Sequence, residues 1–183
     1  AAVCALIYEL QIGTASSYFL GDSITQFSLT IGMFMFAMGI GSFLSRLVRH
    51  RLVAAFVTIE VLLGIVGGLS IPLLYAAYAY TDLFRVTMIL LSLTVGTLIG
   101  LEIPLITRIL RLYRELRITL ANVLSLDYVG ALLASVIFPF FLLPELGLVR
   151  TSLVCGLANV LLGVLVVIVY KERLSRRLKL FVG

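Results

Sequence analysis

Four carboxylates stand inside long apolar stretches of this chain: Glu9, Glu60, Glu102 and Asp127. A carboxylate at the centre of a membrane-spanning helix costs a few kcal/mol on insertion scales, so each of the four is a candidate binding site. No lysine or arginine lies well inside an apolar stretch to neutralise them. Protons, polar neighbours or a bound cation must therefore do so.

Two interpretations of these acids remain open. As ligands they would bind an organic cation, and Pro104 would help, because its ring leaves the carbonyl of Gly100 without the usual helical partner. As packing groups they would be protonated and hydrogen-bonded to neighbouring helices. The polar side chains available for that second role are Tyr8, Gln11, Thr107, Asn122, Ser125, Tyr128 and Asn159.

The sequence predicts no metal site, no cofactor site and no catalytic group. Its only histidine, His50, lies in an arginine-rich connection, which excludes a Ser/His/Asp triad and haem ligation by paired histidines. Gly39 and Gly41 lie inside an apolar stretch without the preceding strand that a dinucleotide site requires, so we interpret them as packing residues. The chain is not expected to be catalytic on its own.

The elements that must position the acids follow from composition. Of 183 residues, 62% are hydrophobic and 13% charged, and the mean hydropathy is +1.19. These values exclude a water-soluble globule and predict an all-α, polytopic integral membrane helix bundle, because backbone in lipid must be helical. We expect residues 1–183 to form one transmembrane domain without a soluble domain. The expected elements are about six helices at 1–20, 24–45, 52–74, 84–107, 119–143 and 148–170, then a basic tail at 171–183.

The basic residues predict the orientation of this bundle. Twelve of the 14 lysines and arginines follow the second, fourth and sixth expected helices, whereas Arg85 and Arg150 fall on the other side. Positive residues near helix ends remain in the cytoplasm, so both termini should be cytoplasmic. The net charge of +5 thus reflects topology and contact with lipid headgroups rather than nucleic-acid binding. The twelve are Arg46, Arg49, Arg51, Arg108, Arg111, Arg114, Arg117, Lys171, Arg173, Arg176, Arg177 and Lys179.

The depth of each acid follows from the rise of a helix, about 1.5 Å per residue. Glu60, Glu102 and Asp127 lie roughly 8 to 14 Å from the cytoplasmic face by this measure, and Glu9 lies near the middle of its helix. We therefore expect the first three to line a cytosol-facing cavity, with Glu9 deeper.

Several segments have to be taken together: Tyr8-Glu9-Leu10, Gly13-Thr14, residues 21–28, residues 36–42, residues 100–105, residues 124–131 and residues 146–151. In combination they resemble the multi-pass membrane region of bacterial membrane-bound spermidine synthase-like proteins, a branch of the polyamine aminopropyltransferase family. The resemblance covers nearly the whole chain and implies a bacterial inner-membrane location. In that family a cytosolic Rossmann-like domain transfers an aminopropyl group from decarboxylated S-adenosylmethionine to a diamine. That domain's glycine-rich loop and catalytic aspartate have no counterpart here, so no catalytic residue is carried over.

Three functions are therefore weighed. The first is a membrane domain that binds a polyamine or related cation between Glu9, Glu60, Glu102 and Asp127. The second is a proton-coupled cation transporter, which with only six helices would need a homo-oligomer. The third is a structural anchor or assembly subunit of a larger membrane complex, in which the acids only hold helices together.

Overall fold

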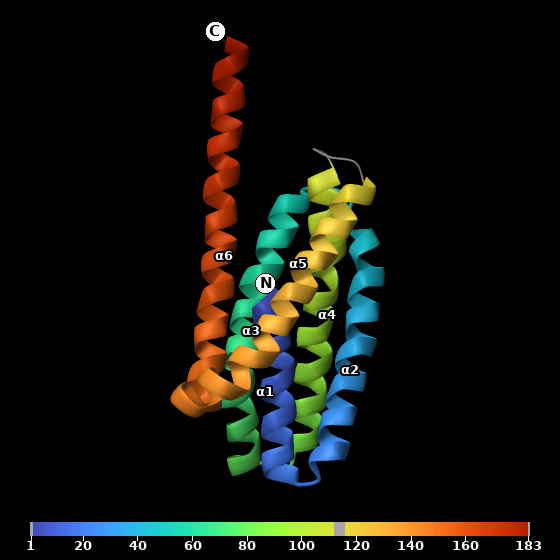
Figure 1. Ribbon diagram of the computed structural model, residues 1–183, viewed down its shortest axis with the longest axis vertical. Helices are drawn as coiled ribbons and strands as arrows, with labels where there is room; N and C mark the ends of the chain where they lie inside the picture. Colours follow the sequence, from blue (N-terminus) through green and yellow to red (C-terminus); the bar gives the residue numbers. More distant parts are fainter. Residues whose placement is uncertain (1, 112–115, 183) are drawn as a thin grey trace.

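In a computed structural model that describes residues 2–111 and 116–182, the chain is helical, and those residues contain no strand. The all-α prediction is confirmed. Six long helices run up and down beside one another (Figure 1). Their bounds are α1 Ala2–Leu20, α2 Ser23–Leu44, α3 Leu52–Tyr80, α4 Phe84–Arg111, α5 Leu116–Ile137 and α6 Leu143–Val182, with a 3₁₀ turn at Ser45–Leu47 and a π-helical turn at Phe138–Leu142.

Four stretches of the described chain are long and apolar enough to cross a membrane: Ser23–Leu47, Leu52–Tyr80, Phe84–Arg111 and Leu120–Tyr170. The last contains most of α5 and the start of α6, which meet at a sharp bend. These lengths and compositions suit a membrane-associated protein. The 19-residue α1 is not among the four, and Glu9 and Gln11 lower its hydropathy.

The structure differs from the expected helix bounds at the end of α3, at the junction of α5 and α6, and at the end of α6. Helix α3 continues past residue 74 to Tyr80 with Pro72 inside it, because a proline removes one backbone hydrogen bond without ending a helix that neighbours support. The expected turn at residues 144–147 is a bend between α5 and α6. There the π-helical turn is followed by Gly147, whose φ of 70° is a backbone conformation that favours glycine. The basic tail continues α6 as a helix to Val182.

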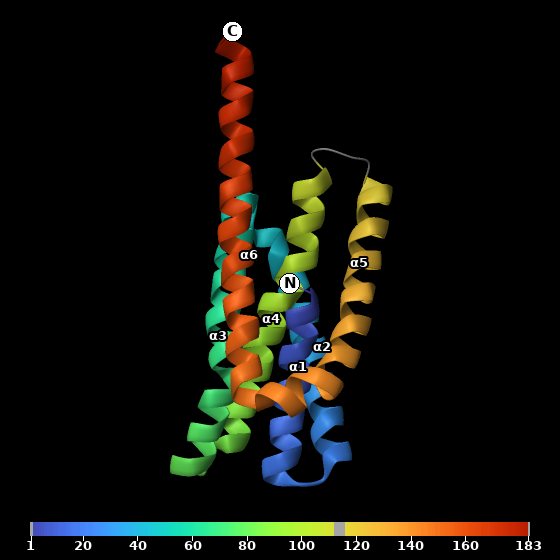
Figure 2. The same ribbon diagram turned by 60° about the vertical axis from the view of Figure 1, so that its left-hand side comes forward.

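Most of the arginines that the structure describes lie at one end of the helix bundle, as the sequence predicts. The α2–α3 connection, the end of α4 and the end of α6 lie at one end of the bundle, and the α1–α2 and α3–α4 turns lie at the other (Figures 1 and 2). Arg108 Nη1 donates a 3.0 Å hydrogen bond to the Ser45 carbonyl and so ties α4 to the turn after α2. Arg85 lies at the opposite end, and Arg114 lies outside the described residues. Which end faces the cytoplasm stays a prediction.

Two helix pairs are packed through glycine. A Cβ at Gly41 of α2 would collide with the Thr97 backbone of α4, and a Cβ at Gly64 of α3 would lie 2.6 Å from the Gly156 carbonyl of α6. Small residues at such crossings let helix backbones approach closely, which is a main source of association energy in lipid. The pairs α2/α4 and α3/α6 are accordingly the most extensive helix contacts among the described residues.

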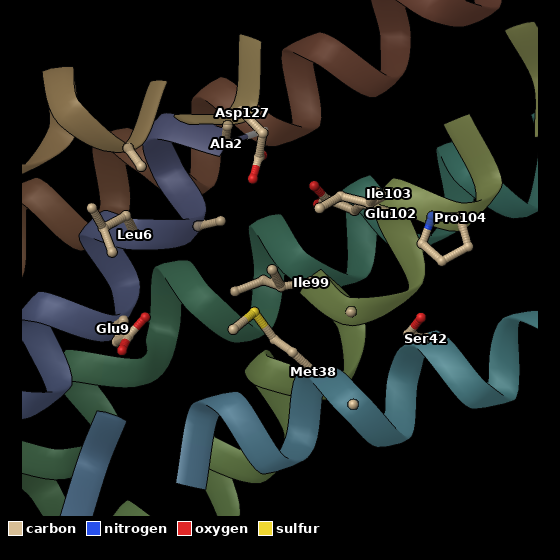
Figure 3. A pocket seen from close by; sticks show the side chains of 14 residues that line it. Ala2, Leu6, Glu9, Met38, Ser42, Ile99, Glu102, Ile103, Pro104 and Asp127 are labelled. Carbon is tan, nitrogen blue, oxygen red and sulfur yellow. The ribbon is translucent and has the colours of Figure 1, made fainter. Parts of the chain in front are cut away.

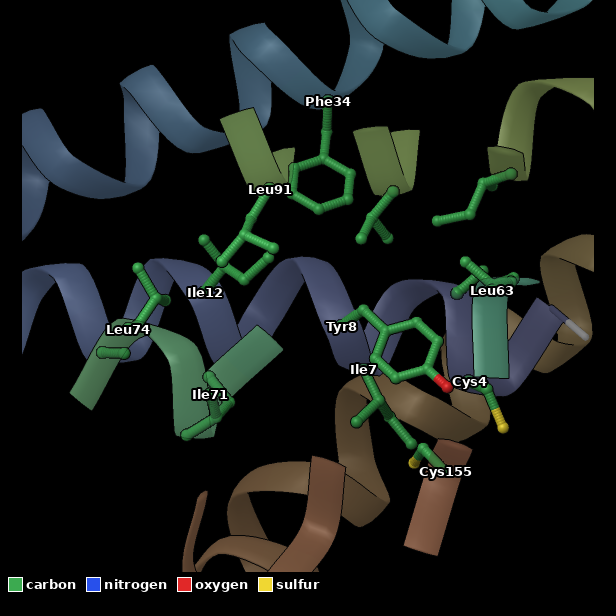
Figure 4. Close-up of a cluster of buried hydrophobic side chains, with 14 of the residues drawn as sticks. Cys4, Ile7, Tyr8, Ile12, Phe34, Leu63, Ile71, Leu74, Leu91 and Cys155 are labelled. Atoms are coloured by element: carbon green, nitrogen blue, oxygen red, sulfur yellow. The ribbon is translucent and has the colours of Figure 1, made fainter. Parts of the chain in front are cut away.

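Helix α1 fills the space between these two pairs. Its buried side chains, including Tyr8 and Ile12, meet Phe34 of α2, Leu63 of α3 and Leu91 of α4 (Figure 4). A helix that carries Glu9 and Gln11 is therefore enclosed by apolar neighbours. This placement brings Glu9 to the interior side of the bundle, near α2 and α4.

Candidate functional site

A cavity of about 420 Å³ lies between α1, α2, α4 and α5, and three of the four predicted acids line it. Glu9 comes from α1, Glu102 from α4 and Asp127 from α5. In Figure 3, Asp127 and Glu102 face each other across a gap, and Glu9 lies farther along α1. The structure thus joins carboxylates that are far apart in the chain.

Glu102 is the most enclosed of the three cavity acids. Its side chain is 6% exposed, and its Oε1 has no hydrogen-bond partner. A buried carboxyl oxygen without a partner carries a large desolvation cost. A proton, a water molecule or a cation in the cavity would satisfy it.

The wall beside Glu102 supplies a second kind of oxygen. Pro104 lies inside α4 and has no N–H, so the carbonyl of Gly100 lacks its usual donor. Both residues line the cavity. The side chain of Ser42, from α2, adds a hydroxyl to the same wall. The cavity thus offers neutral acceptors next to its carboxylates.

A second, smaller cavity of about 220 Å³ meets the first at the acids. Both are lined by Ala2, Glu102, Ile103 and Asp127. The smaller one continues toward the arginine-bearing end of α4, where Leu110 lines it. Glu102 and Asp127 therefore line both cavities, at the place where the two adjoin.

No lysine or arginine lines either cavity within the part of the chain that the structure describes. Two facing carboxylates at low dielectric cannot both stay charged without a counter-charge. The described residues also contain no group of three or more His, Cys, Asp or Glu side chains placed to hold a metal ion. The arrangement can bind one or more protons or an organic cation with ammonium groups.

Glu60 lies outside both cavities. Its side chain is fully buried in α3, and neither carboxyl oxygen has a partner. A Cβ on Gly163 would lie 3.6 Å from the Glu60 Cβ, which places Glu60 against α6. Its carboxylate is still close enough to Glu102 to interact with it electrostatically. Sequence reasoning groups Glu60 with Glu102 and Asp127, and the structure places it behind them.

Sequence reasoning did not identify Met38 and Ser42 as cavity residues. Both come from α2, whose acid-free sequence gave no chemical signal. They reach the cavity because the glycine contacts of α2 with α4 bring the two helices together beside Glu102. The signal that could have found them is the spacing of Met38, Ser42 and Gly41 on neighbouring faces of one helix.

Comparison with known proteins gives a consistent result. The polyamine aminopropyltransferase of Leptospira interrogans is 47% identical over 86% of this chain and 32% of its own length. Polyamine aminopropyltransferase 1 of Streptomyces coelicolor is 44% identical over 97% of this chain and 34% of its own length. The chain is a homologue of bacterial polyamine aminopropyltransferases. It spans about a third of the length of these curated relatives.

The homology extends to a Mycobacterium tuberculosis polyamine aminopropyltransferase, which is 36% identical over 86% of this chain and 32% of its own length. No family model and no solved structure matches the chain. The predicted resemblance to spermidine synthase-like proteins is confirmed by the aminopropyltransferase homologues.

Proposed function

We propose that this chain is the multi-pass membrane region of a polyamine aminopropyltransferase-like protein, and that it binds a polyamine or related organic cation. The cation would lie in the larger cavity, with its ammonium groups on Glu9, Glu102 and Asp127. One observation supports this most directly: carboxylates from three helices line one cavity, and no basic side chain is among its described lining residues. Ammonium–carboxylate hydrogen bonds are strong where water is scarce.

The proposed setting is a bacterial inner membrane crossed six times, with both termini in the cytoplasm. The one-sided arginines favour this orientation. The smaller cavity leads from the acid pair toward that arginine-bearing end, so a cation would enter from the cytosol. We assign no step of the aminopropyl transfer named for the relatives to any residue of this chain. In this proposal the chain supplies only the cation site.

The test is cation binding by the purified protein in lipid nanodiscs, measured by calorimetry with putrescine and spermidine. Glu102→Gln and Asp127→Asn each remove one charge with little change in shape. Losing a hydrogen bond to a charged group costs about 1.5 to 3 kcal/mol, so each variant should weaken binding by about tenfold or more. Asp82→Asn, at an exposed loop position, is the matched control. Unchanged binding in both cavity variants would overturn the proposal.

A second function, proton-coupled cation transport, is favoured by one observation. Glu102 and Asp127 lie where two cavities meet, as a carrier site between two access routes would. Proteoliposomes loaded with labelled putrescine should then show efflux that depends on an imposed pH gradient. Binding without gradient-dependent flux would leave the first function and remove the second.

A further inference from the structure

The charges of the larger cavity lie at its two ends. Helices α1 and α5 run side by side in the same direction (Figures 1 and 2), and a Cβ at Gly130 would lie 2.9 Å from the Ala2 Cβ. Asp127 precedes Gly130 by three residues, and Glu9 follows Ala2 by seven. At 1.5 Å per residue, Asp127 and Glu9 are therefore about 15 Å apart along the bundle.

The wall between these ends is apolar. Leu6 of α1, Met38 of α2 and Ile99 of α4 lie between Glu9 and the Glu102–Asp127 pair (Figure 3). No carboxylate stands midway among the lining residues. An ammonium group at that level would lose its water and gain no charged partner, which is costly.

We propose that the cavity selects a linear α,ω-diamine whose two ends are separated by an unbroken methylene chain. One ammonium binds between Glu102 and Asp127, and the other binds Glu9. The methylenes pack on Leu6, Met38 and Ile99. This inference rests on the proposed cation site and names its ligand class: a dication with charge only at its ends, in preference to a triamine.

The expected preference for a diamine over a triamine arises from the group at the middle of the ligand. Spermidine and octamethylenediamine have the same number of chain atoms between their terminal nitrogens, and they differ where spermidine carries its inner nitrogen. The methylene at that point is stabilised by burial, whereas the inner ammonium is desolvated without a charged partner. Putrescine is too short to bring both of its ammonium groups to the two ends.

The experiment compares these three ligands by calorimetry on the protein in nanodiscs. We expect octamethylenediamine to bind at least about tenfold more tightly than spermidine and than putrescine. Glu9→Gln should weaken octamethylenediamine by about tenfold and leave putrescine nearly unchanged, because putrescine uses only the Glu102–Asp127 end. Asp82→Asn should change none of the three affinities.

A second variant tests the middle of the cavity by a gain of binding. Met38→Glu adds a carboxylate where the wall is apolar, so it should reverse the preference and favour spermidine. Folding of each variant is checked by its thermal unfolding in the same nanodiscs.

Two results would overturn this inference while the proposed cation site stands. The first is that the natural sequence binds spermidine more tightly than octamethylenediamine. The second is that Glu9→Gln lowers the affinities for putrescine and octamethylenediamine equally. In both cases Glu102→Gln and Asp127→Asn would still abolish binding. If the last two variants leave every ligand bound as before, the cation site itself is refuted. A preference unchanged by a folded Met38→Glu would also overturn the assignment of the cavity middle.

Discussion

The side-chain amide of Asn159 in α6 donates a 3.4 Å hydrogen bond to the hydroxyl of Tyr8 in α1, and both side chains are almost completely buried. This contact joins the first helix to the last across 151 positions of sequence. Tyr8 also packs against Gly67 of α3. The Tyr8 side chain therefore contacts α6 through its hydroxyl and α3 through its ring.

Removing this hydrogen bond should loosen α1. Tyr8→Phe and Asn159→Ala should each lower the thermal stability of the protein in detergent, and their coupling in a double-mutant cycle should be about 0.6 kcal/mol, the average for such bonds in membrane proteins. Strict additivity of the two changes would show that the bond contributes nothing.

A glycine pair on α2 tests the close packing with α4. Gly41→Ala should destabilise the protein by about 1 to 3 kcal/mol, because its Cβ would collide with the Thr97 backbone. Gly32→Ala is the matched control on the same helix, since a Cβ there meets nothing within 4 Å. Alanine favours helix over glycine, so the control should be neutral or slightly stabilising. Thermal unfolding of both variants provides the measurement. Equal losses at the two positions would contradict the crossing.

Asp22 gives the bundle a pH-dependent helix cap. It accepts hydrogen bonds from the Thr25 hydroxyl at 2.6 Å and from the Thr25 N–H at 3.3 Å, and these bonds hold the pKa of Asp22 below its ordinary value. A lowered pKa in the folded state gives stability that is present above the unfolded pKa of about 3.9 and is lost as the pH falls through the folded value.

Asp22→Asn keeps a side-chain acceptor and removes the charge. Its thermal stability should be lower than that of the natural sequence at neutral pH, and the difference should shrink once the pH falls below the lowered folded pKa of Asp22, where the carboxyl is protonated. A difference that stays constant over the whole pH range would refute the charged cap.

The membrane orientation can be tested at two exposed connections. His50→Cys lies between α2 and α3 at the arginine-bearing end, and Asp82→Cys lies between α3 and α4 at the other end. In intact spheroplasts, a membrane-impermeant maleimide should label Asp82→Cys and spare His50→Cys until the membrane is opened. Both natural cysteines, Cys4 and Cys155, are buried. The reverse labelling pattern would invert the proposed topology.

Hydropathy was sufficient to predict the six helices and the start of most of them, because a helix in lipid must be long, apolar and closed in its own hydrogen bonds. It did not predict where α3, α5 and α6 end. The sequence also predicted a turn at residues 144–147, but not the π-helical form of the bend between α5 and α6. The bend depends on the π-helical turn and on Gly147 at positive φ, neither of which leaves a period in the sequence.

The sequence predicts a depth for each acid, but not the neighbour that its side chain faces. Counting residues along a helix gives the level of Glu60 and of Glu102, and both levels are similar. Which neighbour a side chain faces depends on tertiary packing, and Glu60 faces α6 whereas Glu102 faces the cavity. The same limit hid Met38, whose role depends on how closely α2 approaches α4.

Pro104 has a consequence for the site at acid pH. The Gly100 carbonyl that it leaves without a donor is an acceptor that never titrates. When protons occupy all three cavity carboxyls, the cavity loses its charge and still keeps one backbone oxygen able to accept a hydrogen bond. A neutral molecule such as water would then donate a hydrogen bond to this carbonyl. Acidification would therefore replace the bound cation with a neutral molecule rather than leave the cavity empty.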